Sequence, residues 1–401
     1  MIPALPISGP APDPSPAPFP IEEAIAASRA ADTLGGFRRS GFYRRHGPAL
    51  EEWLRRLRSG GPAESEQPEG SDRLRLVHWN IEQGKRWDRI VAAAGDTPWL
   101  RKADLWTLNE VDLGTARAGN RDVARELAER LGLYWIYASC FFEFTKGTGS
   151  DKSVPGENSI GLHGIAIFSR WPLDDPGSAD LPDCFDYFRL PEEKRYGVRR
   201  VLWATVRHPL QPFTLATAHF EVRNVPACRA RQMAGSLAAL PDGPCLFAGD
   251  WNTHTFRRGS LLRSAAEFVR LQRTPASKIE RQLIEPQNLE PSLRMVERAG
   301  FEIGAWNEAA PTALQVLSGV EELGGLPGPA RRGIQGLFGL ERRTLRMRLD
   351  WIAVRGPWTP ASGGGGAWTG TDLGPDGALA SDHAPIGIEA LWPGGAALPR
   401  G

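Results

Sequence analysis

The sequence predicts an α/β fold in which strands and helices alternate along one large domain. Runs rich in branched and aromatic residues, such as 74–82 and 103–111, have the composition of strands. Segments with apolar residues at three- and four-residue spacing between them predict helices. Several strand-like runs end on a polar side chain, which is where α/β folds bring functional groups together.

Length and composition allow a sizeable core. The chain has 401 residues, 41% of them hydrophobic, which fits one large catalytic domain with an extension or two modest domains. The formal net charge of +1 argues against a general polyanion-binding protein, although it is compatible with local basic patches. No apolar run approaches the roughly 18 residues of a membrane span, and no signal-peptide pattern is present. A cytoplasmic protein is therefore expected.

The four cysteines are scattered along the chain, at Cys140, Cys184, Cys228 and Cys245. They lack the paired spacing of metal ligands, and their number is small for a disulfide scaffold. They are predicted to be buried thiols.

The first 72 residues are predicted to precede the catalytic domain. Residues 1–20 are rich in proline, which predicts an extended, disordered tail. Residues 21–72 are expected to form two short helices, at 21–34 and 49–57, and a linker from 59. Arginines in this region could contact phosphates, but a solvated face is the favoured interpretation; they are Arg38, Arg39, Arg44, Arg45, Arg55, Arg56 and Arg58.

The catalytic domain is expected over 73–393, with polar residues at its first two strand ends. Asn80 falls near the end of the first strand and Glu110 at the end of the second. A carboxylate in that place is often only a helix cap or a surface charge. Asn120 is predicted to cap a helix that Gly132 ends. Further strands are expected at 134–139, 161–170, 198–207, 213–221 and 386–391.

Two later strands carry candidate catalytic groups. His219 stands at the end of one of them, and Arg223, just beyond it, is a candidate substrate contact. The other stops abruptly at Gly-Asp-Trp-Asn, where Asp250 and Asn252 share a face because they are two residues apart. That pair suits a metal or a water molecule, with a turn cap as the alternative.

Residues 257–345 are predicted to be a helical insertion, with helices at 261–271, 289–298 and 313–323. Its basic end could contact substrate or stay solvated, and both interpretations stay open. A glycine-rich flexible loop is expected at 363–366, and residues 394–401 are predicted to be a tail.

The C-terminal part supplies a histidine with two carboxylates. Asp350 lies in a strand-like segment, and Asp382 and His383 follow about thirty residues later. This set provides an imidazole, a carboxylate to orient it and a spare carboxylate for a metal.

Taken together and in order, these motifs resemble those of the endonuclease/exonuclease/phosphatase superfamily. The motifs are Trp79-Asn80, Asn109-Glu110, the segment 164–170, Ala218-His219, the segment 249–252, the segment 349–352 and Ser381-Asp382-His383, and the resemblance covers about 74–391. It implies a four-layered sandwich of two mixed β-sheets flanked by helices, with the site at one end.

The resemblance also implies a metal site. Glu110 would be the principal metal carboxylate, with Asn80 beside it and Asp382 close enough to contribute. Hard oxygen ligands favour Mg²⁺, with Mn²⁺ as a substitute.

The remaining roles concern the phosphate group. Asp250 and Asn252 resemble the pair that holds the attacking water and a non-bridging oxygen. His383, oriented by Asp350, would be a general base or a phosphate-stabilising imidazolium, and the sequence leaves that choice open. His219 resembles a second histidine that contacts the phosphate.

The expected function is divalent-metal-dependent hydrolysis of a phosphoester. The favoured form is a nuclease-like cleavage of phosphodiesters, for which nucleic acid is a candidate partner. Phospholipids and inositol phosphates are alternative substrates. A catalytically silent binding module of the same fold is the alternative from another class. The sequence does not indicate an oligomeric state.

Overall fold

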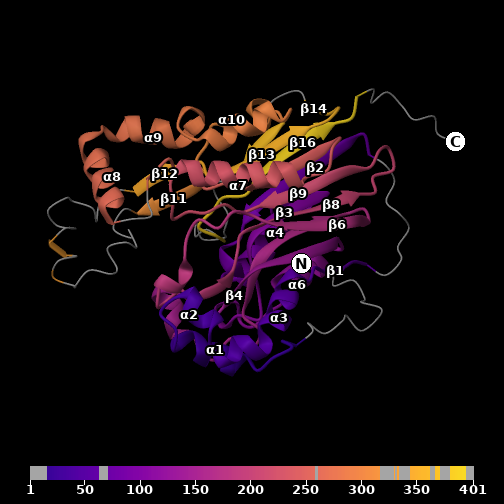
Figure 1. Ribbon diagram of the computed structural model, residues 1–401. Coiled ribbons are helices and arrows are strands. Elements are labelled where there is room, and N and C mark those ends of the chain that lie inside the picture. Colours follow the sequence, from indigo (N-terminus) through magenta and orange to yellow (C-terminus); the bar gives the residue numbers. More distant parts are fainter. Residues whose placement is uncertain are drawn as a thin grey trace.

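The computed structural model describes residues 16–62, 71–257, 261–316, 329, 332–333, 344–361, 366–370 and 380–393. Most of the predicted tails, at 1–15 and 394–401, and most of the glycine-rich loop lie outside these residues. The described part forms two β-sheets packed face to face, with helices on their outer faces. In Figure 1 helices α9 and α10 lie at the top and α1 to α3 at the bottom, on opposite sides of the strands.

The first sheet contains most of the strands from the first half of the chain and the last strand. Its order is β1 (Arg58–Gly60), β4 (Tyr134–Glu143), β5 (Leu162–Ser169), β3 (Leu105–Leu113), β2 (Arg73–Asn80), β16 (Ile386–Leu391) and β14 (Thr359–Pro360). In addition, β15 (Ala367–Thr369) pairs with β16, and β7 (Arg195–Gly197) pairs with β4. Because β2 and β3 run parallel and β3 and β5 antiparallel, the sheet is mixed.

The second sheet has the order β13 (Asp350–Arg355), β10 (Cys245–Asp250), β9 (Phe213–Ala218), β8 (Arg200–Val206) and β6 (Leu173–Asp180). The β9 and β10 strands are parallel, and β10 and β13 are antiparallel, so this sheet is mixed as well. A separate hairpin pairs β11 (Ala313–Val316) with β12 (Thr344–Met347).

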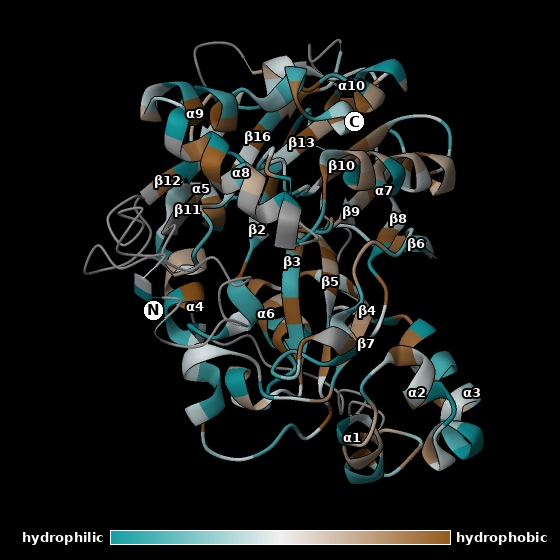
Figure 2. Cartoon of the chain, turned by 60° about the vertical axis from the view of Figure 1, so that its left-hand side comes forward, coloured by the Kyte–Doolittle hydropathy of each residue, from teal (hydrophilic) through white to brown (hydrophobic). Residues whose placement is uncertain are grey.

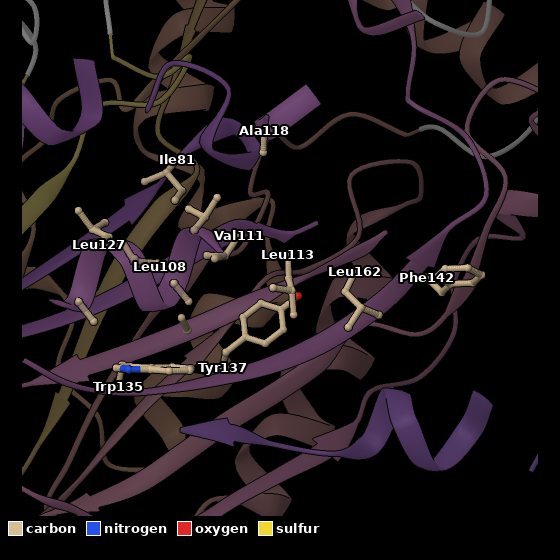
Figure 3. Packing of buried hydrophobic residues seen from close by; sticks show 14 of the residues in the cluster. Ile81, Leu108, Val111, Leu113, Ala118, Leu127, Trp135, Tyr137, Phe142 and Leu162 are labelled. Carbon is tan, nitrogen blue, oxygen red and sulfur yellow. The ribbon is translucent and has the colours of Figure 1, made fainter. Parts of the chain in front are cut away.

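Three apolar layers separate and cover the sheets. Leu76 and Ile167 of the first sheet pack with Leu215, Leu246 and Ile352 of the second, which makes the central core. Strands buried on both faces read as nearly continuous apolar runs, as the sequence of these strands does. Figure 3 shows the layer on the outer face of the first sheet, where Leu108, Val111, Trp135, Tyr137 and Leu162 meet Leu127 of a covering helix.

The helices form the two outer layers, which confirms the predicted four-layered sandwich. The first sheet is covered by α4 (Trp87–Asp96), α5 (Pro98–Arg101) and α6 (Val123–Leu131), and the second by α7 (Pro226–Ala239) and α10 (Pro291–Arg298). Helices α8 (Leu261–Arg273) and α9 (Ala276–Ile284) belong to the predicted insertion. Short 3-10 turns are η1 (Glu82–Gly84), η2 (Ala116–Ala118), η3 (Gly149–Ser153), η4 (Tyr187–Arg189), η5 (Pro286–Asn288) and η6 (Gly304–Trp306). None of the described helices has the length and apolar character needed to cross a bilayer.

The start of α6 differs from the prediction by two residues. Asp122 is its N-cap and accepts a hydrogen bond from the backbone N–H of Arg125, whereas Gly132 ends the helix in the left-handed conformation as expected. Asn120 instead binds the loop across from it, since its side chain contacts Ser159 and Glu157. Both residue types cap helices well, so the choice depended on this tertiary contact.

The helix predicted at 313–323 is wrong where the structure describes it. Ala313–Val316 forms β11, which pairs along its length with β12. The rest of that segment lies outside the described residues. The apolar spacing fits either element over so short a run, and pairing with a strand about thirty residues away decides the outcome.

The N-terminal extension packs on the first sheet as α1 (Ile21–Arg29), α2 (Leu34–Arg38) and α3 (Gly41–Arg55) (Figure 2). The ring of Phe19, which lies within the predicted tail, is buried. Its centre lies 5.5 Å from the ring centre of Phe42, 5.4 Å from that of Trp53 and 5.8 Å from that of Phe142. The predicted linker begins inside β1, an edge strand paired with β4. Two arginines of this region form surface ion pairs within the extension, Arg45 with Glu23 and Arg55 with Glu51.

A disulfide corrects the prediction of four thiols. Cys184, in the segment after β6, is bonded to Cys228 in the first turn of α7, whereas Cys140 and Cys245 are buried free thiols. The Cα atoms of Cys184 and Cys228 are 6.2 Å apart, within the range that a disulfide spans. Nothing in the local spacing of the sequence indicates a pair 44 residues apart. Such bonds persist mainly in oxidising compartments, and the expected cytoplasmic location stays a prediction.

Removing this bond should destabilise the protein. Cys184→Ser with Cys228→Ser is expected to lower the free energy of unfolding by about 2 to 4 kcal/mol, because the unfolded chain regains the freedom of the closed loop. Urea unfolding with and without a reductant measures this. The reductant should bring the wild type to the value of the double variant and leave the variant unchanged; a wild type insensitive to reductant would contradict the assignment.

A buried histidine lies at the far edge of the central core. His208 is 2% exposed, with its ring 4.4 Å from that of Trp171 and 5.4 Å from that of Trp392. Its Nδ1 accepts a hydrogen bond from the backbone N–H of Leu210. Burial lowers the pKa of His208 to about 4, so the ring is neutral in the folded protein near pH 6.

This histidine should make stability depend on pH. In the unfolded chain His208 binds a proton near pH 6.5, and in the folded chain only near pH 4. The contribution of neutral His208 to the free energy of unfolding is therefore complete above pH 6.5 and is lost as the pH falls toward 4. The expected loss is about 3 kcal/mol over that window. Urea unfolding of the wild type and His208→Gln from pH 7 to 4 checks it, and parallel pH curves for the two proteins would refute it.

Candidate active site

The site lies where strands of the two sheets end side by side. In the first sheet Asn80 is opposite Asn109, and in the second Asp250 is opposite Asp350. His383 precedes β16, and its backbone bridges to Ala313 of the hairpin. These residues are far apart in the sequence, and the contact of the two sheets brings them together.

A buried histidine and carboxylate form the centre of the site. Nδ1 of His383 lies 2.7 Å from Oδ2 of Asp350. The same oxygen accepts a hydrogen bond of 2.6 Å from the hydroxyl of Thr312, and Oδ1 lies 3.1 Å from Nε2 of His78. Both oxygens of Asp350 are therefore engaged, and the imidazole of His383 is held with Nε2 toward the cavity.

Asp250 lies between two imidazoles. Its Oδ2 is 3.4 Å from Nε2 of His219 and 3.8 Å from Nε2 of His383. The amide of Asn80 donates to this same oxygen at 3.1 Å, and the backbone N–H of Asn252 donates to Oδ1 at 2.9 Å. The carboxylate is thus fixed in orientation at the wall of the cavity.

Glu110 is presented by a β-bulge. The pairing of β3 with β5 shifts between Asn109 and Val111, which leaves Glu110 unpaired with a φ of 53°. A non-glycine residue in this left-handed region is strained, and bulges commonly re-aim a side chain next to an active site. The carboxylate accepts hydrogen bonds from the amides of Asn80, at 3.3 Å, and Gln83.

The other predicted site residues line the same cavity, which has a volume of about 340 Å³. Asp382 is exposed there, and its Oδ1 accepts a hydrogen bond from the hydroxyl of Ser381. The amide of Asn252 donates to the carbonyl of Phe220 at 2.9 Å. Arg223 is ion-paired with Glu193 at 2.6 Å. All the predicted site residues therefore lie at or beside one cavity, and their roles stay predictions.

The charges of the site shift its pKa values in opposite directions. Burial by itself would lower the pKa of His383, but Asp350 and Asp250 outweigh it and raise that pKa well above its ordinary value. Burial opposes ionisation of Glu110, yet His219, His163 and His383 lower its pKa to about 2. Burial and the guanidinium of Arg199 lower the pKa of His219. The site thus favours one charged and one neutral imidazole at neutral pH.

Two sets of residues could hold a cation. Ligand atoms of Asp250, Asp350 and His383 lie within 4.8 Å of one another, but both oxygens of Asp350 already accept hydrogen bonds. Among the described residues, the hydrogen bonds that Glu110 accepts come from two amide groups, and Oε1 of Gln83 beside it is buried with no hydrogen-bond partner there. These uncharged and anionic oxygens suit a hard cation, so the Glu110 side fits the metal better.

Several residues of the site were not predicted. The side chain of Gln83 donates a hydrogen bond to Glu110, and His78 and Thr312 contact Asp350. The side chain of Asn109 accepts a hydrogen bond of 2.8 Å from the backbone N–H of Asp250. His78 could have been identified, because it is two residues before Asn80 and shares its face of β2. The sequence around Thr312 carries no such signal, since its role depends on the position of the hairpin.

Several solved structures are similar to this chain over most of its length. Among solved structures, the chain is similar to an endonuclease/exonuclease/phosphatase from Beutenbergia cavernae DSM 12333, with 17% identity, 80% of this chain and 72% of that chain covered, and a TM-score of 0.46. It is similar to the human Nocturnin catalytic domain with bound sulfate (15% identity, 79% and 93% covered, TM-score 0.43). It is also similar to D. rerio TDP2 in complex with a single-strand DNA product (18% identity, 80% and 99% covered, TM-score 0.41).

No curated protein sequence matches the chain. The family model of the Endonuclease/Exonuclease/phosphatase family matches residues 77–383, a span that includes every predicted site residue. Because this match covers more than half of the sequence, the chain belongs to the endonuclease/exonuclease/phosphatase family.

Proposed function

We propose that this protein hydrolyses phosphodiester bonds with the help of a divalent cation, in a nuclease-like reaction. The observation that carries the proposal is the position of Asp250, which lies within 4 Å of the Nε2 atoms of both His219 and His383 beside the Glu110 carboxylate. Phosphodiester hydrolysis needs an aligned water, a proton acceptor and positive charge at the non-bridging oxygens. This cavity offers a group for each.

The buried groups divide these tasks by charge. Asp250, whose two oxygens are fixed by Asn80 and Asn252, orients the attacking water and accepts its proton. His383, kept protonated by Asp350, donates to a non-bridging phosphate oxygen. The raised pKa of His383 favours this electrostatic role over that of a general base.

His219 completes the phosphate-binding side, where its neutral imidazole contacts the phosphate. A cation held by Glu110, with Asn80 and Asp382 beside it, would supply further positive charge at the phosphate. Mg²⁺ is the ion that these oxygen ligands favour, and Mn²⁺ is the substitute.

An apolar residue at the rim supports a second substrate class. Leu314 of β11 lines the cavity and is 50% exposed, next to Ala313 and Met347. Such a rim suits a lipid chain as well as a nucleic acid base. Phospholipids and inositol phosphates are therefore tested beside nucleic acids.

Loss of either central group should abolish most activity. Asp250→Ala and His383→Ala are each expected to lower turnover by at least about a hundredfold, because each removes a group that acts on the water or the phosphate. Plasmid DNA, RNA, sphingomyelin, an inositol phosphate and bis(p-nitrophenyl) phosphate are assayed with Mg²⁺, Mn²⁺ or EDTA. Asp96→Ala, on the exposed end of α4, is the matched control.

Thermal melting of each variant separates lost chemistry from lost folding. If the wild type leaves every substrate intact with both metals, or if a folded variant keeps near-normal activity, the proposal fails. Activity that survives EDTA would reject the metal dependence alone.

The charge on His383 can be measured directly. Asp350→Asn is expected to lower the pKa of His383, because a neutral amide no longer favours the imidazolium form. Imidazole resonances of the metal-free protein, followed by NMR between pH 5 and 9, report this pKa. Glu389→Gln, which removes a carboxylate paired with Arg73 and Arg75 instead, is the control. The same pKa in wild type and Asp350→Asn would contradict the electrostatic role.

A further inference from the structure

One wall of the cavity is not used by the proposed chemistry. It is formed by the segment between β6 and β8, which carries Tyr187, Glu193, Arg195 and Arg199 and lines the same cavity as Asp250 and His383. The disulfide at Cys184 holds the start of this segment to α7.

Two arginines near this wall have their hydrogen bonds satisfied by carboxylates. Arg117 forms a two-point contact with Asp112, at 2.7 and 3.2 Å, and reaches Glu143 at 3.3 Å. Arg223 donates to Glu193 at 2.6 Å. Their positions are explained by these ion pairs.

The other two arginines are different. Arg195 approaches Glu193 and Glu143 only at 3.6 and 3.7 Å, longer than hydrogen bonds, and its Nε has no hydrogen-bond partner among the described residues. Arg199 donates to the hydroxyl of Tyr187 at 3.3 Å, lies 3.8 Å from Glu221, and has an Nε that is likewise unbonded within the described part of the chain.

Both of these side chains nevertheless have little exposed surface. The side chain of Arg195 is 13% exposed and that of Arg199 is 6% exposed. Leaving donors of a buried guanidinium without acceptors is unfavourable, and buried polar groups are usually paired. The buried Nε atoms do not face open space, but both arginines line the cavity, and the two terminal nitrogens of Arg195 lie 3.6 and 3.7 Å from the nearest carboxylate oxygens. An anion in the cavity would supply closer acceptors to these terminal nitrogens.

The fold holds Arg195 in place from behind. Its guanidinium stacks 4.1 Å from the ring centre of Tyr187, whose hydroxyl is bonded to Glu221. The neighbours of Arg195 face away from the cavity, as alternate residues of a strand do. Lys194 donates to the backbone carbonyls of Ser28 and Ala31 in the N-terminal extension, at 3.0 and 2.6 Å.

Tyr196, on the other side of Arg195, also contacts the N-terminal extension. Its hydroxyl is bonded to Glu51 and lies 2.9 Å from that of Tyr43, both on α3. The N-terminal helices lie beside β4 and β7 in Figure 2. The extension therefore braces the strand that carries Arg195.

We propose that Arg195 and Arg199 form a second anion subsite, which binds a phosphate group of the substrate other than the one that is cleaved. The proposal rests on the proposed function, because it assigns a substrate class to the same cavity. The planar guanidinium fork matches the oxygens of a phosphate and favours it over a neutral hydroxyl. Substrates of this class carry at least two phosphate groups, as multiply phosphorylated nucleotides and inositols do.

Binding without turnover tests the subsite. Calorimetric titration compares thymidine 5′-phosphate with thymidine 3′,5′-bisphosphate, and inositol 1-phosphate with inositol 1,4-bisphosphate, in the presence of Ca²⁺. For the wild type the second phosphate is expected to raise affinity about tenfold or more in at least one pair, which is the usual size of a charged hydrogen bond. The pair that responds identifies nucleotide or inositol as the source.

Variants assign the effect to the arginines. Arg195→Gln is expected to remove the preference for the second phosphate, Arg195→Lys to keep part of it, and Arg298→Gln, on the exposed end of α10, to keep all of it. Thermal melting confirms that each variant folds. If Arg195→Gln does not fold, Arg199→Gln serves as the second test of the subsite.

The outcomes separate the two proposals. Equal affinity within both pairs, no binding of any probe, or a preference that survives Arg195→Gln and Arg199→Gln would overturn the subsite. A preference that stands while every substrate stays intact would overturn only the proposed hydrolysis. Hydrolysis without any preference would overturn only the subsite.

Discussion

The buried carboxylate of Asp350 connects the two sheets at the site. Asp350 begins a strand of the second sheet, while His78 and His383, which both contact it, belong to the first sheet and to the turn before its last strand. A charge in this place is tolerated only because each of its oxygens has a hydrogen-bond donor. The relative position of the sheets, set by the apolar core between them, is therefore also the geometry of the site.

The second sheet also contributes His219 and Asp250, and the first contributes Asn80 and Glu110. Neither sheet carries a complete set of groups for phosphoester chemistry. Packing energy and function consequently depend on the same interface, and core residues such as Leu246 and Ile352 act on the site through the distance between the sheets.

Much of this arrangement could be predicted from the sequence, and the exceptions have a common cause. Asn80 and Asp250 end apolar runs, so the pattern itself indicates strand ends and a shared edge, whereas His383 comes just before the last strand. The four-layered fold and the family follow from the order of these motifs, and both predictions are confirmed. The strand at Ala313–Val316, the bond between Cys184 and Cys228 and the cap at Asp122 depend on contacts between distant segments. The bulge at Glu110 is invisible for the same reason, because only the pairing with β5 reveals it.

The packing of the N-terminal helices changes how the chain divides into units. The family match begins at residue 77, yet β1 adds a strand to the first sheet, and Phe19 packs against Phe142 of that sheet. Through Lys194 and Tyr196 the same helices hold one wall of the cavity. The described part of the extension, residues 16–62, is therefore not a separable module, and a protein trimmed to the family match would expose apolar surface while keeping every proposed catalytic group.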